Sequence, residues 1–317
     1  MSNNYITNLS KKKIWVAGHN GMVGSSIVRK LEKEGCDVIK VEKSSINLLD
    51  QKSTELWIKK NNPEIIILAA AKVGGIKFNM LNKAAFLYEN LMIQNNVIYS
   101  ASKLNVEKLV FIGSSCIYPK NTPQPITEES LMKGPLEETN EGYALAKIAG
   151  LKLCKYLNEE LNKKFISVMP SNVFGINDNF DPNNSHVLGA LLRKVHEAKK
   201  KERNFIEIWG TGKPRREFLY VDDLADAIYF LLKEYKDASP INVGTSKDIS
   251  INELALKISK VLKHKIEIRH NNSMPDGTLL KRLDTSKINS LGWHPKISLE
   301  KGIEKTYLYC LKNNILN

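Results

Sequence analysis

A glycine-rich turn between a short apolar strand and an amphipathic helix limits the fold of this chain more than any other feature. Residues 13–17 are apolar enough for a buried strand, and residues 22–34 have a helical pattern that Gly35 ends. Between them, Gly18, Gly21 and Gly24 recur at every third position. Glycines at this spacing let the backbone turn tightly and approach a pyrophosphate, which the free N–H groups of the helix then bind. The turn therefore predicts a dinucleotide-binding unit, although glycines at such a turn can also be purely structural.

The next hundred residues alternate between strand and helix patterns. Short apolar runs at residues 37–41, 64–71, 109–113 and 165–169 predict strands, and residues 86–104 and 143–161 have helical periodicity. Residues 64–71 are almost wholly apolar, as a central strand of a parallel sheet should be. Crossovers between parallel strands are nearly always right-handed. The pattern predicts an α/β fold with a doubly wound (Rossmann) parallel sheet.

The character of the chain changes after Pro170. A polar loop at residues 177–185 precedes predicted helices at 186–200, 221–235 and 250–262, with short strands at 206–209, 241–244 and 266–269. The strand at 241–244 is expected to return to the main sheet. We therefore expect a dinucleotide domain at 11–170 plus about 221–245, and a smaller, discontinuous C-terminal substrate lobe at 171–220 and 246–317.

Two neighbouring residues past the second strand give opposite indications of the cofactor. Glu42 could accept a hydrogen bond from a ribose 2′-hydroxyl, which favours NAD. Lys43 could pair with a 2′-phosphate, which favours NADP. Both can also be solvated turn residues, so the residues alone leave the choice open.

Tyr143 and Lys147 lie one turn apart on one face of a predicted helix. A free phenol, with a pKa of about 10, is a poor acid at neutral pH, and an adjacent ammonium is expected to lower that pKa. Ser114 and Ser115 follow a predicted central strand, where ligands bind in open α/β sheets. Two other Tyr-x-x-x-Lys pairs, at positions 99/103 and 229/233, show that the spacing alone proves little. The neighbouring serines and the glycine turn make the first pair a candidate centre for reducing a ketone.

Charge and cysteine content limit the partners and the compartment. The net charge of +13 is compatible with nucleic acid, with small polyanions such as a nucleotide sugar, or with a lysine-rich surface of no special role. Because the sequence has no nucleic-acid-binding motif, we expect no nucleic-acid partner. We also expect no membrane segment, no signal peptide and no metal site, since no long apolar run and no C-x-x-C occur. Four scattered cysteines are typical of a cytoplasmic protein.

Several blocks of the sequence, in order, resemble the extended short-chain dehydrogenase/reductase family, and within it the GDP-L-fucose synthases. The most specific are residues 18–24 (GHNGMVG), 68–76 (LAAAKVGGI), 113–120 (GSSCIYPK), 139–150 (TNEGYALAKIAG), 184–187 (NSHV), 209–223 (WGTGKPRREFLYVDD), 241–245 (INVGT), 275–278 (PDGT) and 291–293 (LGW). The resemblance covers nearly the whole chain.

The resemblance implies an NADPH-dependent reduction at C4 of a GDP-linked 4-keto sugar, preceded by epimerisation at C3 and C5. It implies a homodimer formed through the helices at 86–104 and 143–161. The implied catalytic residues are Ser114, Cys116, Tyr143, Lys147 and His186. It assigns the cofactor to Gly18, Asn20, Gly21, Met22, Val23, Gly24, Lys43, Asp50, Ala70, Lys147, Pro170, Asn172 and Val173. It assigns the sugar nucleotide to Ser115, His186, Lys194, Trp209, Arg216 and Asp276.

Some positions depart from the family pattern and keep alternatives open. Lys194 stands where the family usually has arginine, and Asp181 and Gly189 replace a histidine and a proline. Residues 172–176 lack the usual tyrosine and proline. A GDP-4-keto-heptose substrate, or a reductase without epimerisation, fits equally well, and Cys116 or His186 can be structural. An NAD-dependent nucleotide-sugar epimerase or dehydratase and a non-catalytic basic binding protein are the remaining alternatives.

Overall fold

The computed structural model describes residues 9–182, 184–273 and 276–316. Its main feature is a six-stranded sheet in the order β2-β1-β3-β4-β5-β9, in which every neighbouring pair is parallel. The order reverses beside β1, as in doubly wound folds, so the predicted Rossmann class is confirmed. The strands are β1 (Lys13–Ala17), β2 (Asp37–Ile39), β3 (Ile65–Leu68), β4 (Lys108–Ile112), β5 (Lys164–Pro170) and β9 (Ile241–Val243).

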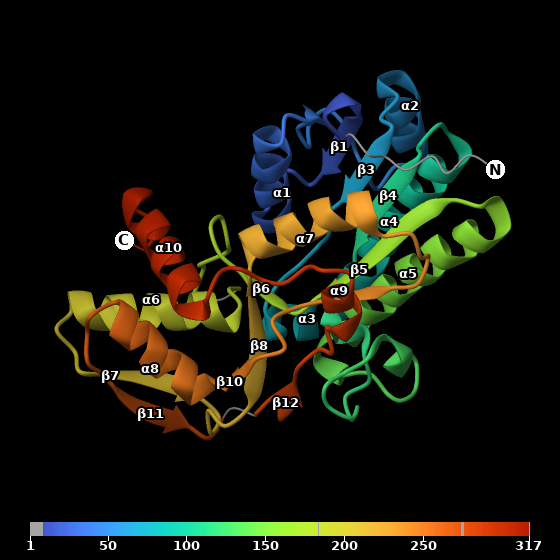
Figure 1. The fold of residues 1–317 in the computed structure, drawn as a ribbon. Coiled ribbons are helices and arrows are strands. Elements are labelled where there is room, and N and C mark those ends of the chain that lie inside the picture. The colour runs from blue at the N-terminus through green and yellow to red at the C-terminus, as the bar shows by residue number, and fades with distance from the viewer. Residues whose placement is uncertain (1–8, 183, 274–275, 317) are drawn as a thin grey trace.

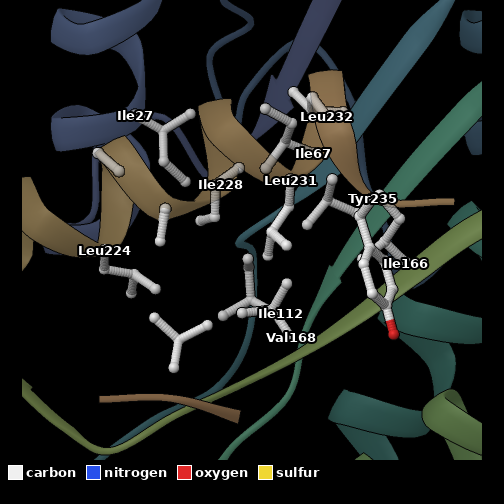
Figure 2. Close-up of a cluster of buried hydrophobic side chains, with 14 of the residues drawn as sticks. Ile27, Ile67, Ile112, Ile166, Val168, Leu224, Ile228, Leu231, Leu232 and Tyr235 are labelled. Atoms are coloured by element: carbon white, nitrogen blue, oxygen red, sulfur yellow. The ribbon is translucent and has the colours of Figure 1, made fainter. Parts of the chain in front are cut away.

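Helices cover both faces of this sheet (Figure 1). Helices α1 (Met22–Lys33) and α7 (Val221–Glu234) pack together on one face, and α2 (Gln51–Asn61), α4 (Lys83–Lys103) and α5 (Glu141–Leu161) lie on the other. The strands are apolar on both sides because successive side chains point to opposite faces. Thus Ile67 joins the cluster under α1 and α7, whereas its neighbour Ile66 joins the opposite cluster. Figure 2 shows Leu224, Ile228 and Leu231 of α7 facing the strand residues of the first cluster.

A second group of elements lies beyond the carboxyl ends of the main strands. Strand β8 (Arg215–Tyr220) pairs with β6 (Asn172–Phe174), β10 (Asp248–Ser250) and β12 (Leu280–Lys281). Strands β7 (Phe205–Trp209) and β11 (Glu267–Asn271) form a separate pair. Helices α6 (Val187–Lys200), α8 (Ile251–Val261) and α10 (Leu299–Lys312) bury a third apolar cluster beside them (Figure 1). We propose that these elements form the smaller lobe, with the domain boundaries predicted above.

The short helices α3 (Ile76–Leu81) and α9 (Ser286–Ser290) complete the fold. Two strands are shorter than predicted. Strand β2 ends at Ile39, and β3 ends at Leu68, where the chain leaves the sheet beside the glycine-rich turn. Strand β9 does return to the main sheet, beside β5. None of the helices in the described parts of the chain is long and apolar enough to cross a membrane.

Candidate active site

The glycine-rich turn lies between β1 and α1 and requires glycine at two positions. Gly18 has φ of +87°, and a Cβ there would lie 2.6 Å from the backbone nitrogen of Ala70. A Cβ on Gly24 would lie 2.1 Å from the carbonyl oxygen of Gly18. Helix α1 begins at Met22 after Gly21, so no side chain caps its first N–H groups. These groups are left to bind an anion, and the turn therefore fits a dinucleotide pyrophosphate.

Polar side chains surround this turn. The Asn20 amide donates to a carboxylate oxygen of Glu42 at 3.1 Å, and the Asn177 amide donates to the Asn20 carbonyl at 2.8 Å. Lys43 is exposed in the turn after β2. Asp50 caps helix α2 by accepting from the Ser53 N–H at 2.5 Å, so this carboxylate already has a structural partner.

The remaining residues assigned to the cofactor lie at the ends of neighbouring elements. Val23 is in the first turn of α1, and its side chain packs between two apolar clusters. Pro170 ends β5, and Asn172 and Val173 open β6. The Asn172 amide donates to the Glu217 carbonyl at 2.9 Å. These strand ends belong to the same edge of the molecule as the glycine-rich turn.

The candidate reducing residues meet at the carboxyl end of β4. Ser114 caps a 3-10 turn by accepting from the N–H of Cys116 at 3.2 Å, and Ser115 and Cys116 are buried in that turn. The Lys147 ammonium donates to the carbonyl of Ile112 at 2.7 Å. It also lies 5.6 Å from the centre of the Tyr143 ring. One helix and one strand end thus bring together a hydroxyl, a thiol, a phenol and an amine.

Burial shifts the pKa values of this group. Burial, and secondarily the nearby Cys116, raise the pKa of Tyr143 far above its usual value. Burial lowers the pKa of Lys147 to about 8, partly opposed by Cys116. The expected net lowering of the Tyr143 pKa is therefore wrong, because burial outweighs the attraction that the Lys147 ammonium, 5.6 Å from the ring centre and bonded to the Ile112 carbonyl, exerts on the phenolate. The phenol itself packs edge-on against Phe86.

The other two Tyr-x-x-x-Lys pairs differ from this one in their surroundings. Lys103 stacks over the ring of Tyr99, which is 44% exposed on the surface of α4. Lys233 lies 5.7 Å from the ring centre of Tyr229 on α7. Neither pair has a strand end with serines beside it, and Lys147 is buried whereas Lys103 is exposed and Lys233 is half-buried.

Cys116 has cationic neighbours that the sequence did not indicate. Burial raises the pKa of its thiol, while Lys281 and, to a smaller extent, Lys147 act in the opposite direction. Lys281 comes from β12 of the smaller lobe, in register with Arg216 on β8. Burial lowers the pKa of Lys281 as well. The separation of 165 positions from Cys116 to Lys281 explains why no local pattern could identify this neighbour.

His186 occupies the N-cap position of α6, directly after the polar loop. Its side chain is 49% exposed, and its Nδ1 lies 3.9 Å from a carboxylate oxygen of Asp178. The residues just before it pack on the end of the β3–α3 connection, where the Gly75 N–H donates to the Asn184 carbonyl at 3.2 Å. His186 therefore lies on a loop that touches the dinucleotide side of the molecule.

The residues assigned to the sugar nucleotide fall into two groups in the smaller lobe. In the first, the Lys194 ammonium donates to the Glu207 carbonyl at 2.8 Å and lies 5.8 Å from the ring centre of Trp209, which is 53% exposed. In the second, Arg216 donates to the Thr278 carbonyl, and Asp276 accepts from both the N–H and the hydroxyl of Thr211.

Glu137, which lies in the connection between β4 and α5, contacts the second group. The sequence alone did not indicate this residue. Its carboxylate accepts from the Thr278 hydroxyl at 3.1 Å and lies 3.5 Å from the Lys120 ammonium. The carboxylate also acts on Arg216 and Lys281, because it opposes the lowering of their pKa values by burial. It follows Pro135 in the connection from β4 to α5, so it links the reducing residues with the smaller lobe.

Comparisons with known proteins agree with this arrangement. The sequence profile of the NAD dependent epimerase/dehydratase family matches residues 14–244. GDP-L-fucose synthase of Sinorhizobium fredii is 50% identical over 299 residues, covering 94% of this chain and 95% of that protein. A GDP-6-OMe-4-keto-L-xylo-heptose reductase from Campylobacter jejuni superposes with a TM-score of 0.90, at 35% identity, over 97% of this chain and 100% of that one.

A second solved structure, a GDP-mannoheptose C4 reductase from Campylobacter jejuni with NADP bound, has a TM-score of 0.86 at 37% identity and covers 95% of this chain and 98% of its own. The resemblance to GDP-L-fucose synthases drawn from the sequence blocks is thus confirmed. The glycine-rich turn, the sheet order and these likenesses agree, and the chain belongs to the NAD-dependent epimerase/dehydratase family.

Proposed function

We propose that this chain is an NADPH-dependent oxidoreductase that reduces the C4 ketone of a GDP-linked 4-keto sugar, either a 6-deoxy hexose or a heptose. The observation that carries the proposal is the cluster at the end of β4, in which Cys116 and Lys147 are buried and Ser114 and Tyr143 are half-buried. Its support comes from relatives that are named for GDP-L-fucose synthesis or for GDP-heptose reduction, one of them with NADP bound.

In the reduction, NADPH when bound supplies a hydride to C4 of the sugar. Ser114 donates a hydrogen bond to the ketone oxygen and holds it near the phenol. Tyr143 gives its proton to that oxygen, and the resulting phenolate is stabilised by the charge of Lys147. The raised pKa of Tyr143 keeps the proton on the phenol before the reaction, so the residue rests in its acid form.

We further propose that the chain epimerises the sugar at C3 and C5 before reduction. The C4 ketone makes the protons on both carbons acidic. Cys116, as a thiolate, removes such a proton, and His186 returns one to the opposite face. The ammonium of Lys281 favours the thiolate, which burial otherwise opposes. Epimerisation therefore depends on residues from both lobes.

A reductase without epimerisation is the second candidate, and three observations favour it. The pKa of Cys116 is raised, so the thiol form predominates at neutral pH. His186 is half exposed, and its Nδ1 lies 3.9 Å from a carboxylate oxygen of Asp178. Both solved relatives described above are named as reductases of GDP-heptoses.

We also propose that two copies of the chain form a homodimer through α4 and α5, in the cytoplasm. Exposed apolar and aromatic side chains on these helices support the first point, among them Tyr88, Tyr99 and Tyr156. The free state of all four cysteines supports a reducing compartment.

The function is tested by incubating the protein with NADPH and either GDP-4-keto-6-deoxymannose or a GDP-4-keto-heptose in D2O. We expect oxidation of NADPH with at least one of them, and NMR of the product reports reduction at C4. Deuterium at C3 and C5 identifies the epimerase, and its absence identifies the simple reductase. Tyr143→Phe is expected to lower the reduction rate by about 10²- to 10⁴-fold while NADP binding persists. Unchanged turnover in this variant would exclude Tyr143 as the acid.

A further inference from the structure

A loop of the smaller lobe bonds directly to the glycine-rich turn. The Asn177 amide donates to the Asn20 carbonyl at 2.8 Å, although 157 positions separate the two residues. A carbonyl oxygen can only accept, so the NH2 group of Asn177 must face it. The side-chain oxygen of the same amide accepts from the Tyr309 hydroxyl of α10 at 3.5 Å. One side chain thus connects the turn before α1 with the last helix of the fold.

The bond from Asn177 fixes one peptide unit of the turn. The N–H and the carbonyl of a planar trans peptide point in opposite directions. In the unit that joins Asn20 to Gly21, the carbonyl bonds to Asn177, and the N–H donates to the Gly18 carbonyl at 3.1 Å. This peptide plane is therefore held at both ends. The N–H groups that suit a pyrophosphate follow directly, because α1 begins at Met22.

The smaller lobe in turn holds Asn177 in place. Its backbone is left-handed, with φ of +68°, a conformation that asparagine adopts more readily than most residues. Three positions further on, the Phe180 side chain is buried in the third apolar cluster. Arg193 of α6 donates to the Phe180 carbonyl at 2.7 Å. The loop is thus anchored in the core of the smaller lobe close to the residue that reaches the turn.

A fixed turn matters for affinity. Donors that already point at a ligand before it binds lose less freedom on binding, so the same contacts give tighter association. The bond from Asn177 is neutral and exposed. A bond of this kind contributes a factor of about three to ten to an equilibrium constant.

From these contacts we infer that Asn177 is a positioning residue for the cofactor, through which the smaller lobe orients the pyrophosphate-binding N–H groups of the glycine-rich turn. The inference rests on the proposed function for the identity of the cofactor. It concerns the pyrophosphate alone, so Asn177 acts on the affinity for the dinucleotide and not on hydride transfer at the nicotinamide.

The test is calorimetric titration of the full chain with NADP⁺, in the absence of any sugar. Asn177→Gly removes the amide and keeps a residue that tolerates a positive φ. We expect its dissociation constant for NADP⁺ to rise by about three- to tenfold. In turnover of the GDP-4-keto sugar that the wild type reduces, the KM for NADPH should rise by a similar factor. The kcat at saturating NADPH should stay within about twofold of that of the wild type.

A second variant keeps the shape of the side chain. Asn177→Asp has the same size as the wild-type residue, but a carboxylate cannot donate to the Asn20 carbonyl and adds a negative charge near the pyrophosphate. We expect Asn177→Asp to weaken NADP⁺ binding at least as much as Asn177→Gly does.

Asn162→Gly is the matched control. Asn162 is also an exposed asparagine with a positive φ, of +52°, and it follows α5. It precedes β5, whereas the glycine-rich turn follows β1, so the two lie at opposite edges of the parallel sheet. The control should bind NADP⁺ as the wild type does. Thermal unfolding checks that each variant folds.

Two results would overturn the inference. One is an Asn177→Gly variant whose affinity for NADP⁺ matches that of Asn162→Gly. The other is a kcat that falls by more than about twofold at saturating NADPH, which would place the loss at the reacting centre and not at the turn. Either result, with a wild type that binds NADP⁺ and reduces the ketone, leaves the proposed function standing. A wild type that does not bind NADP⁺ overturns both.

Discussion

Tyr143 and Cys116 act on each other through charge, although each has a separate proposed role. Ionising Cys116 would raise the pKa of Tyr143 and favour the ammonium form of Lys147. A thiolate therefore makes the phenol a weaker acid while it strengthens the cation beside it. The proposed epimerisation and the proposed reduction are thus linked, because both depend on the charge of Lys147.

This charge leads to a pH dependence. The pKa of Lys147 is lowered to about 8, so its ammonium is present below that pH and is lost above it. Because the ammonium stabilises the phenolate formed in the reduction, we expect kcat to fall as the pH rises through about 8. Lys147→Met should abolish this alkaline limb together with most of the activity. The measurement is a pH profile of NADPH oxidation at saturating substrate, and a flat profile up to the pKa range of a free lysine would contradict the assignment.

Lys281 gives a second prediction at the scale of single residues. Removing its charge in Lys281→Met should raise the pKa of the Cys116 thiol further, because burial would then be opposed mainly by Ser114 and Lys147. We expect slower alkylation of Cys116 at neutral pH, measured by peptide mass spectrometry, and slower deuterium uptake at C3 and C5. Reduction of an already epimerised ketone should be affected less.

The control for this variant is Lys120→Met. The Lys120 side chain is 46% exposed, and its ammonium lies near Glu137. It changes the net charge equally but is not among the groups that influence the thiol. Equal alkylation rates in Lys281→Met and the wild type would show that Lys281 has no part in activating Cys116.

At the scale of elements, the sequence predicted best those strands and helices whose residue patterns the parallel sheet imposes. Strand β1 and the starts of α1 and α7 agree with the prediction to the residue, because a parallel sheet demands continuous apolar runs and each helix begins at a turn or an acidic pair. Helix α2 was missed because its only fully buried side chains are Thr54 and Ile58. Strands β10 and β12 have three and two residues, too few to show alternation.

The residues of the site likewise divide into those that local sequence patterns indicate and those that only tertiary packing brings there. Gly18 lies in the turn between β1 and α1, and Ser114 and Lys147 lie at the end of β4 and on the next long helix along the chain, so local patterns in the sequence indicated them. Glu137 and Lys281 belong to the site only because β12 lies beside β8 and close to the β4–α5 connection. That juxtaposition is a product of tertiary packing, and no spacing along the chain encodes it.

Glu217 is the residue that holds these elements together. It is fully buried on β8 and accepts from the N–H groups of Leu283 and Ser246, at 2.7 and 2.8 Å, and from that of Thr245. Those donors follow β12 and β9, so one carboxylate ties the ends of two strands to β8. A Cβ on Gly244 would lie 2.1 Å from the same carboxylate.

Removing this carboxylate should therefore destabilise the fold. Glu217→Ala leaves three buried N–H groups without an acceptor, and we expect the free energy of unfolding to fall by about 3–5 kcal/mol. Glu217→Gln keeps one acceptor oxygen and should lose less. Chemical denaturation measures both, and Glu304→Ala, at an exposed ion pair with Lys301, should change stability by less than about 1 kcal/mol. A Glu217→Ala variant as stable as this control would exclude the role.

At the scale of the whole molecule, contacts between distant segments enclose the proposed site. Asn177 of the polar loop bonds to the glycine-rich turn, and Glu137 bonds to Thr278 of the smaller lobe. The dinucleotide and the sugar nucleotide would thus bind between the dinucleotide domain and the smaller lobe, which are already in contact. The outer faces of α4 and α5 lie on the opposite side of these helices from the sheet, so an interface there would leave the site open (Figure 1).

The proposed homodimer makes the last prediction. Tyr156 on α5 is 48% exposed, and a glutamate there would place a charge in the proposed interface. We expect Tyr156→Glu to sediment as a single chain at concentrations where the wild type sediments as two. Leu308→Glu is the control, because Leu308 is 58% exposed on α10, far along the chain and in the other lobe, so this variant should stay dimeric. A charge is costly only where association removes it from water, which is why the two variants should differ. A wild type that sediments as one chain, or two variants that dissociate alike, would place the interface elsewhere or remove it.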